Sequence, residues 1–204
     1  MNSIHARNHQ TQNETVSAGK KAISDEVKSM IRVNQAGEYG AARIYAGQLA
    51  ILKGTPAEEA LTEMAAQEAE HLQKFNRLII EHQVRPTILQ PLWHVGGYAL
   101  GMLTAMMGEK AAHACTIAVE EVIDGHYQSQ LKRLESPIDS GIPPLNAHSI
   151  NVPLAELIEQ CRQDEIAHKE TAIHLGGRNA PAYAALTTAI KKISRTAIWL
   201  SSRI

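Results

Sequence analysis

The chain has 204 residues, of which 44% are apolar. This length and composition indicate a globular domain with a sizeable core and exclude a disordered chain. Lys and Arg number 20 against 21 Asp and Glu. Because a balanced charge argues against binding nucleic acid through bulk electrostatics, we expect no nucleic-acid partner.

The two cysteines, Cys115 and Cys161, do not belong to a CxxC motif. Their spacing therefore predicts neither a thiolate zinc site nor a disulfide framework. We expect two buried thiols in a reducing compartment.

The first 20 residues are polar and show no apolar periodicity. We expect a flexible tail over residues 1–20 and a single domain over 21–204. The tail lacks the apolar central stretch of a signal peptide, so we expect a cytoplasmic protein. A cleaved targeting segment is the alternative, but the tail has few arginines and contains an acid.

Glycine and proline mark the ends of the expected helices, and no segment shows the alternation of a strand. The chain is therefore predicted to be all-α. Thr55-Pro56-Ala57-Glu58 has the pattern of a capping box, and residues 136–153 are expected to form a long loop. Helices are predicted over about 24–53, 55–85, 109–136, 154–175 and 181–204.

Residues 86–108 contain no Asp, Glu, Lys or Arg, which makes them a membrane-spanning candidate by length. Their prolines and glycines favour a buried or membrane-surface hairpin instead. The stretch 190–200 is amphipathic and basic, and such a helix can lie on a bilayer surface. An ordinary surface helix is the alternative for this stretch alone, but the two segments together favour membrane contact.

Acidic residues fall on the apolar faces of four predicted helices, where an ordinary core would have none. Their neighbours Glu121 and Asp164 fall on the polar faces instead. In two helices a histidine follows the inward glutamate by one turn. The inward residues are Glu38, Glu68, His71, Glu120, Glu165 and His168.

Buried, unpaired carboxylates are costly, by several kcal/mol each. Two divalent metal ions would balance the charge of four converging glutamates. Oxygen and imidazole ligands together suit iron or manganese. One Glu from each of two helices, with Glu-x-x-His from each of two others, is the pattern of ferritin-like dimetal proteins.

The Glu-x-x-His motif alone is weak evidence, so the prediction depends on where each pair lies along its helix. Glu38 precedes the turn at Gly54 by about as many residues as Glu68 and His71 follow it. Antiparallel helices joined there bring all three side chains to a similar height in the bundle. We therefore favour a metal site over buried acids paired with Arg or Lys.

From about residue 28 to its end, the chain resembles the demethoxyubiquinone hydroxylases, di-iron enzymes of ubiquinone biosynthesis in the ferritin-like superfamily. No predicted ligand position departs from the family pattern, and only the N-terminal tail is left unexplained by it. The stretches that carry the resemblance are residues 32–41, 43–48, 84–87, 91–93, 114–121, 126–127 and 180–184.

The resemblance implies that Glu38, Glu68 and His71 bind one iron, and that Glu120, Glu165 and His168 bind the other. Glu68 and Glu165 would bridge the two ions. The implied reaction uses O₂ to hydroxylate the ring of a polyprenyl methoxybenzoquinol at the membrane. A bacterial-type chain of this kind would be a peripheral protein on the cytoplasmic side of the cell membrane. Other ubiquinone-biosynthesis proteins are possible partners.

An external donor must supply electrons, because no GxGxxG nucleotide motif follows a strand in this chain. The family suggests NADH acting through the bound quinone. Tyr127 lies on the ligand stripe and could donate a hydrogen bond to a ligand or touch substrate; a core tyrosine bonded to a carbonyl is the alternative. His126 is proposed from the resemblance alone.

Three further residues, Trp93, Tyr98 and Met102, are candidates to line the path of a prenyl tail, with plain apolar packing or membrane insertion as the alternative. Other functions also remain open at this point. They are a di-iron hydroxylase of another lipid or of tRNA, a ferritin-like protein that handles iron or peroxide, and a non-catalytic membrane scaffold.

Overall fold

The computed structural model describes residues 23–135 and 150–204, and this part of the chain consists of helices joined by turns and short connections, with no strand. The predicted all-α class is confirmed. The expected tail over 1–20 and most of the expected loop over 136–153 lie outside the described residues. The helices are α1 (Asp25–Leu52), α2 (Glu58–Glu81), α3 (Gln90–Met106), α4 (Glu109–Glu135), α5 (Asn151–His174) and α6 (Tyr183–Ser201), with a 3₁₀ turn, η1 (Gly177–Asn179).

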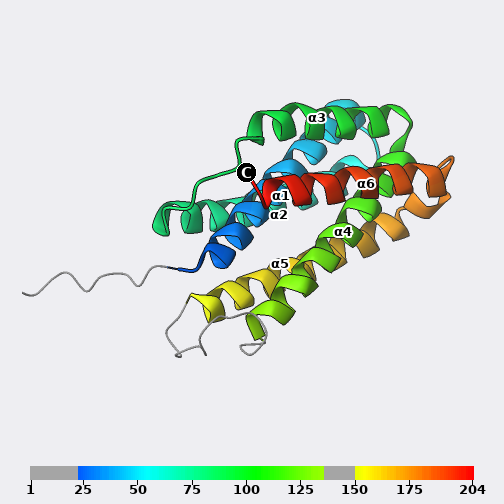
Figure 1. Cartoon of the computed structure of the whole chain (residues 1–204). Helices are drawn as coiled ribbons and strands as arrows, with labels where there is room; N and C mark the ends of the chain where they lie inside the picture. Colours follow the sequence, from blue (N-terminus) through cyan, green and yellow to red (C-terminus); the bar gives the residue numbers. More distant parts are fainter. Residues whose placement is uncertain (1–22, 136–149) are drawn as a thin grey trace, which may run out of the picture.

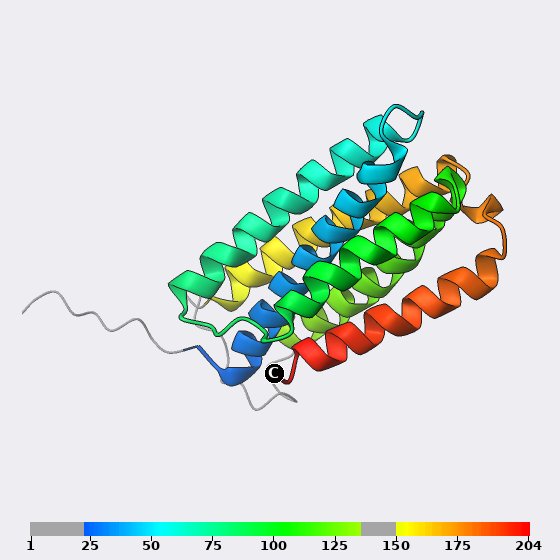
Figure 2. The same ribbon diagram turned by 90° about the horizontal axis from the view of Figure 1, so that it is seen from above.

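Helices α1, α2, α4 and α5 form a four-helix bundle, which is joined on one side by α3 and α6 (Figure 1). Helix α3 runs along α1, and α6 runs along α4 (Figure 2). Each bundle helix contributes a side chain with no exposed surface to the core: Ile31, Phe75, Ile117 and Ile158. Burial of such side chains is the main force that holds the helices together.

The turn between α1 and α2 is built much as its sequence predicts. Gly54 adopts a φ of 81°, which favours glycine. The Gly54 N–H donates to the Glu58 carboxylate at 2.6 Å, and the Ala57 N–H donates to the Thr55 hydroxyl at 3.3 Å. The Glu58 side chain therefore caps the residue before Thr55, one position earlier than in a standard capping box.

Two helix boundaries differ from the prediction. Helix α2 ends at Glu81 rather than near residue 85, because Gln83 adopts a φ of 52° and the Val84 N–H turns back to the Ile79 carbonyl at 2.9 Å. Helix α5 begins at Asn151, inside the expected loop. Pro153 lies in its first turn, where a missing N–H leaves no hydrogen bond unmade.

The hairpin predicted within residues 86–108 was wrong, because residues 90–106 form one continuous helix, α3. Two of its glycines serve close packing rather than a reversal of the chain. A Cβ atom on Gly101 would lie 2.0 Å from the Ile44 carbonyl oxygen, and one on Gly97 would lie 2.9 Å from that of Gly40. Among the helices described, none combines the length and apolar character needed to span a bilayer.

Candidate metal centre

Six side chains converge in the middle of the bundle, and they come from all four of its helices. Helix α1 supplies one glutamate, α4 supplies another, and α2 and α5 each supply a glutamate and a histidine. Every one of them is at most 2% exposed, whereas the neighbouring Glu121 is exposed and pairs with Lys191 of α6. The inward residues are those picked out by the sequence: Glu38, Glu68, His71, Glu120, Glu165 and His168.

These residues form two groups whose ligand atoms lie within 4.8 Å of one another. One group contains Glu38 and His71, and the other contains Glu120 and His168. Both groups contain Glu68 and Glu165. Two carboxylates shared between neighbouring groups are what a pair of bridging ligands requires, although the individual ligand roles stay a prediction.

Several of the oxygen and nitrogen atoms that could bind a metal have no hydrogen-bond partner although they are fully buried. Both carboxylate oxygens of Glu68 are in this position, as is Nδ1 of His71. One oxygen each of Glu38, Glu120 and Glu165 is also without a partner. Since buried polar atoms are nearly always satisfied, these orphaned donors fit metal ions with oxygen and nitrogen ligands.

The electrostatics of the cluster point the same way. Burial, and then the charge of Glu165, raise the pKa of Glu68 and of Glu120 well above the usual 4.5. Burial alone would lower the pKa of His71, but its close contacts with Cys161, Glu165 and Glu38 outweigh burial and raise it. Carboxylates in such surroundings must hold protons or face cations, and the donor set suits divalent cations.

Two buried tyrosines donate hydrogen bonds to the outer glutamates, Glu38 and Glu120, which are the glutamates not shared between the two groups. The Tyr45 hydroxyl donates to Glu120 Oε1 at 3.0 Å, and the Tyr127 hydroxyl donates to Glu38 Oε1. Each tyrosine follows the glutamate of its own helix by seven residues and bonds to the glutamate of the other. Sequence reasoning named Tyr127 but missed the role of Tyr45, although the matching spacing was visible.

The outward nitrogens of the two histidines also have partners that sequence reasoning missed. His71 Nε2 lies 3.0 Å from Asp164 Oδ2, and His168 Nε2 lies 2.7 Å from Gln67 Oε1. Asp164 was placed with the polar residues, and its side chain is indeed 34% exposed. Their position in the sequence could have indicated this role, because Asp164 and Gln67 each come directly before the glutamate of a Glu-x-x-His pair.

His126 lies outside the carboxylate cluster. Its Nε2 accepts a hydrogen bond from Gln130 Nε2 at 2.8 Å, and Gln130 in turn exchanges two hydrogen bonds with Asn34. Burial lowers the pKa of His126 to about 4, which keeps Nε2 free as an acceptor. The structure therefore places His126 in a polar network between α1 and α4.

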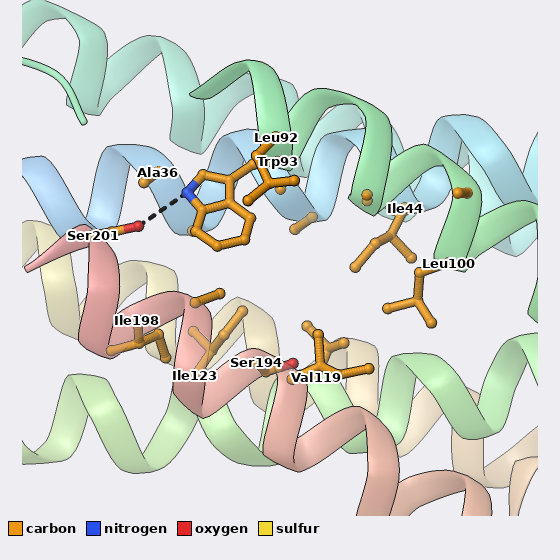
Figure 3. A pocket seen from close by; sticks show the side chains of 18 of the residues that line it. Ala36, Ile44, Leu92, Trp93, Leu100, Val119, Ile123, Ser194, Ile198 and Ser201 are labelled. Carbon is orange, nitrogen blue, oxygen red and sulfur yellow. Dashed lines mark hydrogen bonds between the residues drawn. The ribbon is translucent and has the colours of Figure 1, made fainter. Parts of the chain in front are cut away.

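Beside the cluster lies an apolar pocket of about 440 Å³, enclosed by α1, α3, α4 and α6. Trp93 lines it, and its indole Nε1 donates to Ser201 Oγ at 3.0 Å across the gap between α3 and α6 (Figure 3). The other two expected channel residues, Tyr98 and Met102, are not part of the lining; the Tyr98 ring packs instead against Arg43 at 4.9 Å.

The pocket wall includes residues that adjoin the metal centre along the chain. Gly37 and Val119 line it, and each directly precedes an outer glutamate. Its wall is almost wholly apolar, formed by side chains such as Ile44, Leu100 and Ile198 (Figure 3). A long hydrocarbon chain matches that lining better than a polar ligand does.

Comparison with known proteins identifies relatives along nearly the whole described region. The sequence is 46% identical over 178 residues to the NADPH-dependent 3-demethoxyubiquinone 3-hydroxylase of Dictyostelium discoideum, covering 87% of this chain and 77% of the relative. It is 42% identical over 202 residues to the 3-demethoxyubiquinol 3-hydroxylase of Rhodospirillum rubrum, covering 98% and 89%. The human NADPH-dependent enzyme is 43% identical over 180 residues, covering 87% and 78%.

The family described as ubiquinone biosynthesis protein COQ7 matches residues 25–201, from the first turn of α1 to the last of α6. All six residues of the candidate metal centre and the whole lining of the pocket fall within that match. Together with the relatives, this match shows that the chain belongs to the COQ7 family of ubiquinone-biosynthesis proteins.

Proposed function

We propose that this protein is a monooxygenase that hydroxylates the ring of a polyprenyl methoxy-methyl-benzoquinol, demethoxyubiquinol, in ubiquinone biosynthesis. The observation that carries the proposal is the buried Glu/His cluster with orphaned carboxylate oxygens. Family membership and the names of the relatives support the substrate. An apolar pocket beside the cluster favours this lipid over a tRNA substrate.

Two iron ions are the proposed cofactor. Glu38 and His71 would hold one ion, Glu120 and His168 the other, and Glu68 and Glu165 would bridge them. Bound there, iron supplies the electron transfer that activates O₂. The chain supplies the donor set, excludes water by burying every ligand, and fixes the outer carboxylates through tyrosine hydrogen bonds.

The pocket is the proposed site for the prenyl tail, with the quinol ring directed towards the outer glutamates. Its residues Gly37 and Val119 adjoin Glu38 and Glu120 in the chain, so a tail held there leaves the ring beside the centre. Trp93 and Ser201 bond across the pocket and would have to part, or the tail would have to pass beside them.

Hydroxylation places one atom of O₂ on the ring and releases the other as water, which requires two electrons and two protons. We propose that reduced nicotinamide is the ultimate donor. The family resemblance suggested NADH, whereas the mitochondrial relatives are named for NADPH. Purified protein given quinol, O₂ and each nucleotide in turn would decide between the two donors.

A peripheral position on the cytoplasmic side of the cell membrane is also proposed. Leu92 and Leu103 of α3 and Ile193 of α6 each line the pocket and are more than half exposed, so the pocket opens between apolar side chains. A quinol with a long tail resides in the bilayer, and such a rim would let it enter without crossing water. Other ubiquinone-biosynthesis proteins could dock on the same surface.

The test is the lipid-quinone profile of cells that lack this protein, complemented with wild type or with Glu165→Ala. We expect demethoxyubiquinone to accumulate and to be cleared by wild type but not by the variant. Glu170→Ala is the matched control, because Glu170 lies on the same helix and is exposed. A normal ubiquinone profile in the deletion strain, with no turnover by the purified protein, would overturn the named reaction.

A further inference from the structure

The two halves of the metal centre repeat one pattern of supporting residues. Helices α1 and α4 each carry a glutamate followed seven residues later by a tyrosine, which donates a hydrogen bond to the glutamate of the other half. Helices α2 and α5 each carry a polar residue directly before the glutamate of Glu-x-x-His, and that residue bonds the histidine of the other helix. The two sides of the centre are therefore built alike.

The repetition fails at the partners of the two histidines. The partner of His71 is Asp164, a carboxylate, whereas the partner of His168 is Gln67, a neutral amide. The contacts are otherwise equivalent, with Nε2-to-oxygen distances of 3.0 Å and 2.7 Å. The centre therefore has one negatively charged support and one neutral support.

Both histidines present the other ring nitrogen to the centre. Nδ1 of His71 lies 3.5 Å from an oxygen of Glu38 and from one of Glu165. Nδ1 of His168 lies 3.3 Å from an oxygen of Glu68 and 3.2 Å from one of Glu165. With a metal ion bound at Nδ1, each ring would carry its proton on Nε2 and donate it outward to Asp164 or Gln67.

A hydrogen bond from Nε2–H to a charged acceptor is stronger than one to an amide. It draws the proton from the ring and makes the opposite nitrogen a better donor to a metal ion. The negative charge of Asp164 also attracts a cation at the nearer position. Both effects act in the same direction, because both favour a metal ion bound to His71.

We propose that Asp164 and Gln67 are positioning residues that make the two metal positions unequal, so that the His71 position binds a divalent ion first and more tightly. This inference rests on the proposed dimetal centre. It adds an order of loading, which the shared carboxylates alone do not set, since Glu68 and Glu165 belong to both positions. The His168 position is then the more labile one.

The experiment is an anaerobic titration of the full-length protein with Co²⁺, in which binding is monitored by calorimetry and by visible absorption. Wild type is expected to bind two ions in steps separated beyond the statistical spacing of identical sites. Asp164→Asn keeps an acceptor oxygen but removes the charge, and it is expected to weaken the tighter step by about 10- to 100-fold. Gln67→Glu is the mirror change, and it is expected to tighten the weaker step.

A site-specific reading comes from the ring N–H protons of the Co²⁺-loaded protein, which a neighbouring paramagnetic ion shifts far from their usual NMR position. At one equivalent, one such resonance should dominate, and Asp164→Asn should move it while Gln67→Glu leaves it in place. Glu156→Gln removes an exposed charge from the same helix as Asp164 and is the control for a general charge effect.

Equal effects of Asp164→Asn on both steps, or an effect no larger than that of Glu156→Gln, would overturn the inference while leaving the dimetal centre intact. If Asp164→Asn does not fold, Gln67→Glu alone is the test. The inference would then be overturned if Gln67→Glu failed to tighten the weaker binding step. Binding of fewer than two ions by wild type would contradict the proposed centre itself.

Discussion

Side chains of this centre form hydrogen-bonded pairs between helices. The effect of such a bond on metal affinity can be measured by removing one polar atom while the side chain stays buried. Tyr45 illustrates this point. It is 2% exposed and gives its hydroxyl to Glu120. Burial, followed by the charge of Glu120, raises the pKa of Tyr45 well above 10.0, so its hydroxyl remains a donor at every working pH.

We predict that Tyr45→Phe lowers the affinity for the ion that Glu120 is proposed to bind by about 10- to 100-fold, the usual effect of losing the hydrogen-bond partner of a ligand. A Co²⁺ competition titration measures this. Tyr39→Phe is the matched control, because it removes a hydroxyl from the same helix that contacts His94 instead. Identical affinities for the two variants would show that the Tyr45 hydroxyl does not support the ligand.

His126 gives a prediction for stability against pH. Its folded pKa of about 4 lies below the ordinary 6.5, so the unfolded chain binds a proton that the folded chain excludes. Stability from this residue is therefore complete above pH 6.5 and is lost as the pH falls towards 4. Its loss can reach about 1.4 kcal/mol per pH unit, the value for one proton.

The variant His126→Gln keeps an acceptor for Gln130 but does not titrate. Urea unfolding of both metal-free proteins between pH 6.5 and 4.5 should show a shallower loss of stability for the variant. Other acids titrate in both proteins and cancel in the comparison. Parallel curves would mean that His126 takes up its proton without disturbing the network with Gln130 and Asn34.

Among the elements, α3 depends most on glycine. A methyl group on Gly101 would lie 2.0 Å from the Ile44 carbonyl oxygen, and backbone cannot move aside as a side chain can. We predict that Gly101→Ala forces α3 away from α1 and lowers the free energy of unfolding by about 1–3 kcal/mol, as overpacking does. Urea denaturation measures the change.

The matched control is Gly125→Ala in α4. Gly125 is exposed, and a Cβ atom there meets nothing within 4 Å. Since alanine is the better helix former, this variant should gain about 0.5–1 kcal/mol. Destabilisation by both changes would indicate that helix glycines matter in this fold for a reason other than close packing.

The sequence predicted most of the bundle because helical periodicity identifies an inward face without knowledge of the partner helix. It placed Glu120 inward and Glu121 outward, as the structure does. It could not predict that residues 90–106 form one helix, because the glycines acquire their meaning only from what they touch on α1. Asp164 and Gln67 were missed for the same reason, since their bonds run between helices.

On the scale of the whole molecule, the exposed apolar surface is concentrated around the pocket. Leu92, Val95, Leu103 and Met106 recur along one face of α3, and each is at least 55% exposed. Trp199 of α6 is 54% exposed. Helix periodicity places the four α3 residues on a single stripe, as expected of a helix that lies on a bilayer.

We predict that the double variant Val95→Ser and Met106→Ser reduces binding to anionic phospholipid vesicles by about tenfold or more, since each exposed apolar side chain contributes on the order of 1 kcal/mol on burial. Co-sedimentation measures the binding. Neither residue lines the pocket. Ile80→Ser, which removes a 77% exposed side chain from α2, is the control; equal losses for both would argue against a specific membrane face.

The crossed hydrogen bonds have a consequence for how the chain folds. The hairpin of α1 and α2 holds Glu38, but the hydroxyl that Glu38 needs is on α4; the hairpin of α4 and α5 holds Glu120, whose hydroxyl is on α1. A half-assembled bundle would bury acids without their donors. Each hairpin is therefore a poor intermediate by itself, and the molecule should pass between folded and unfolded states in a single cooperative step.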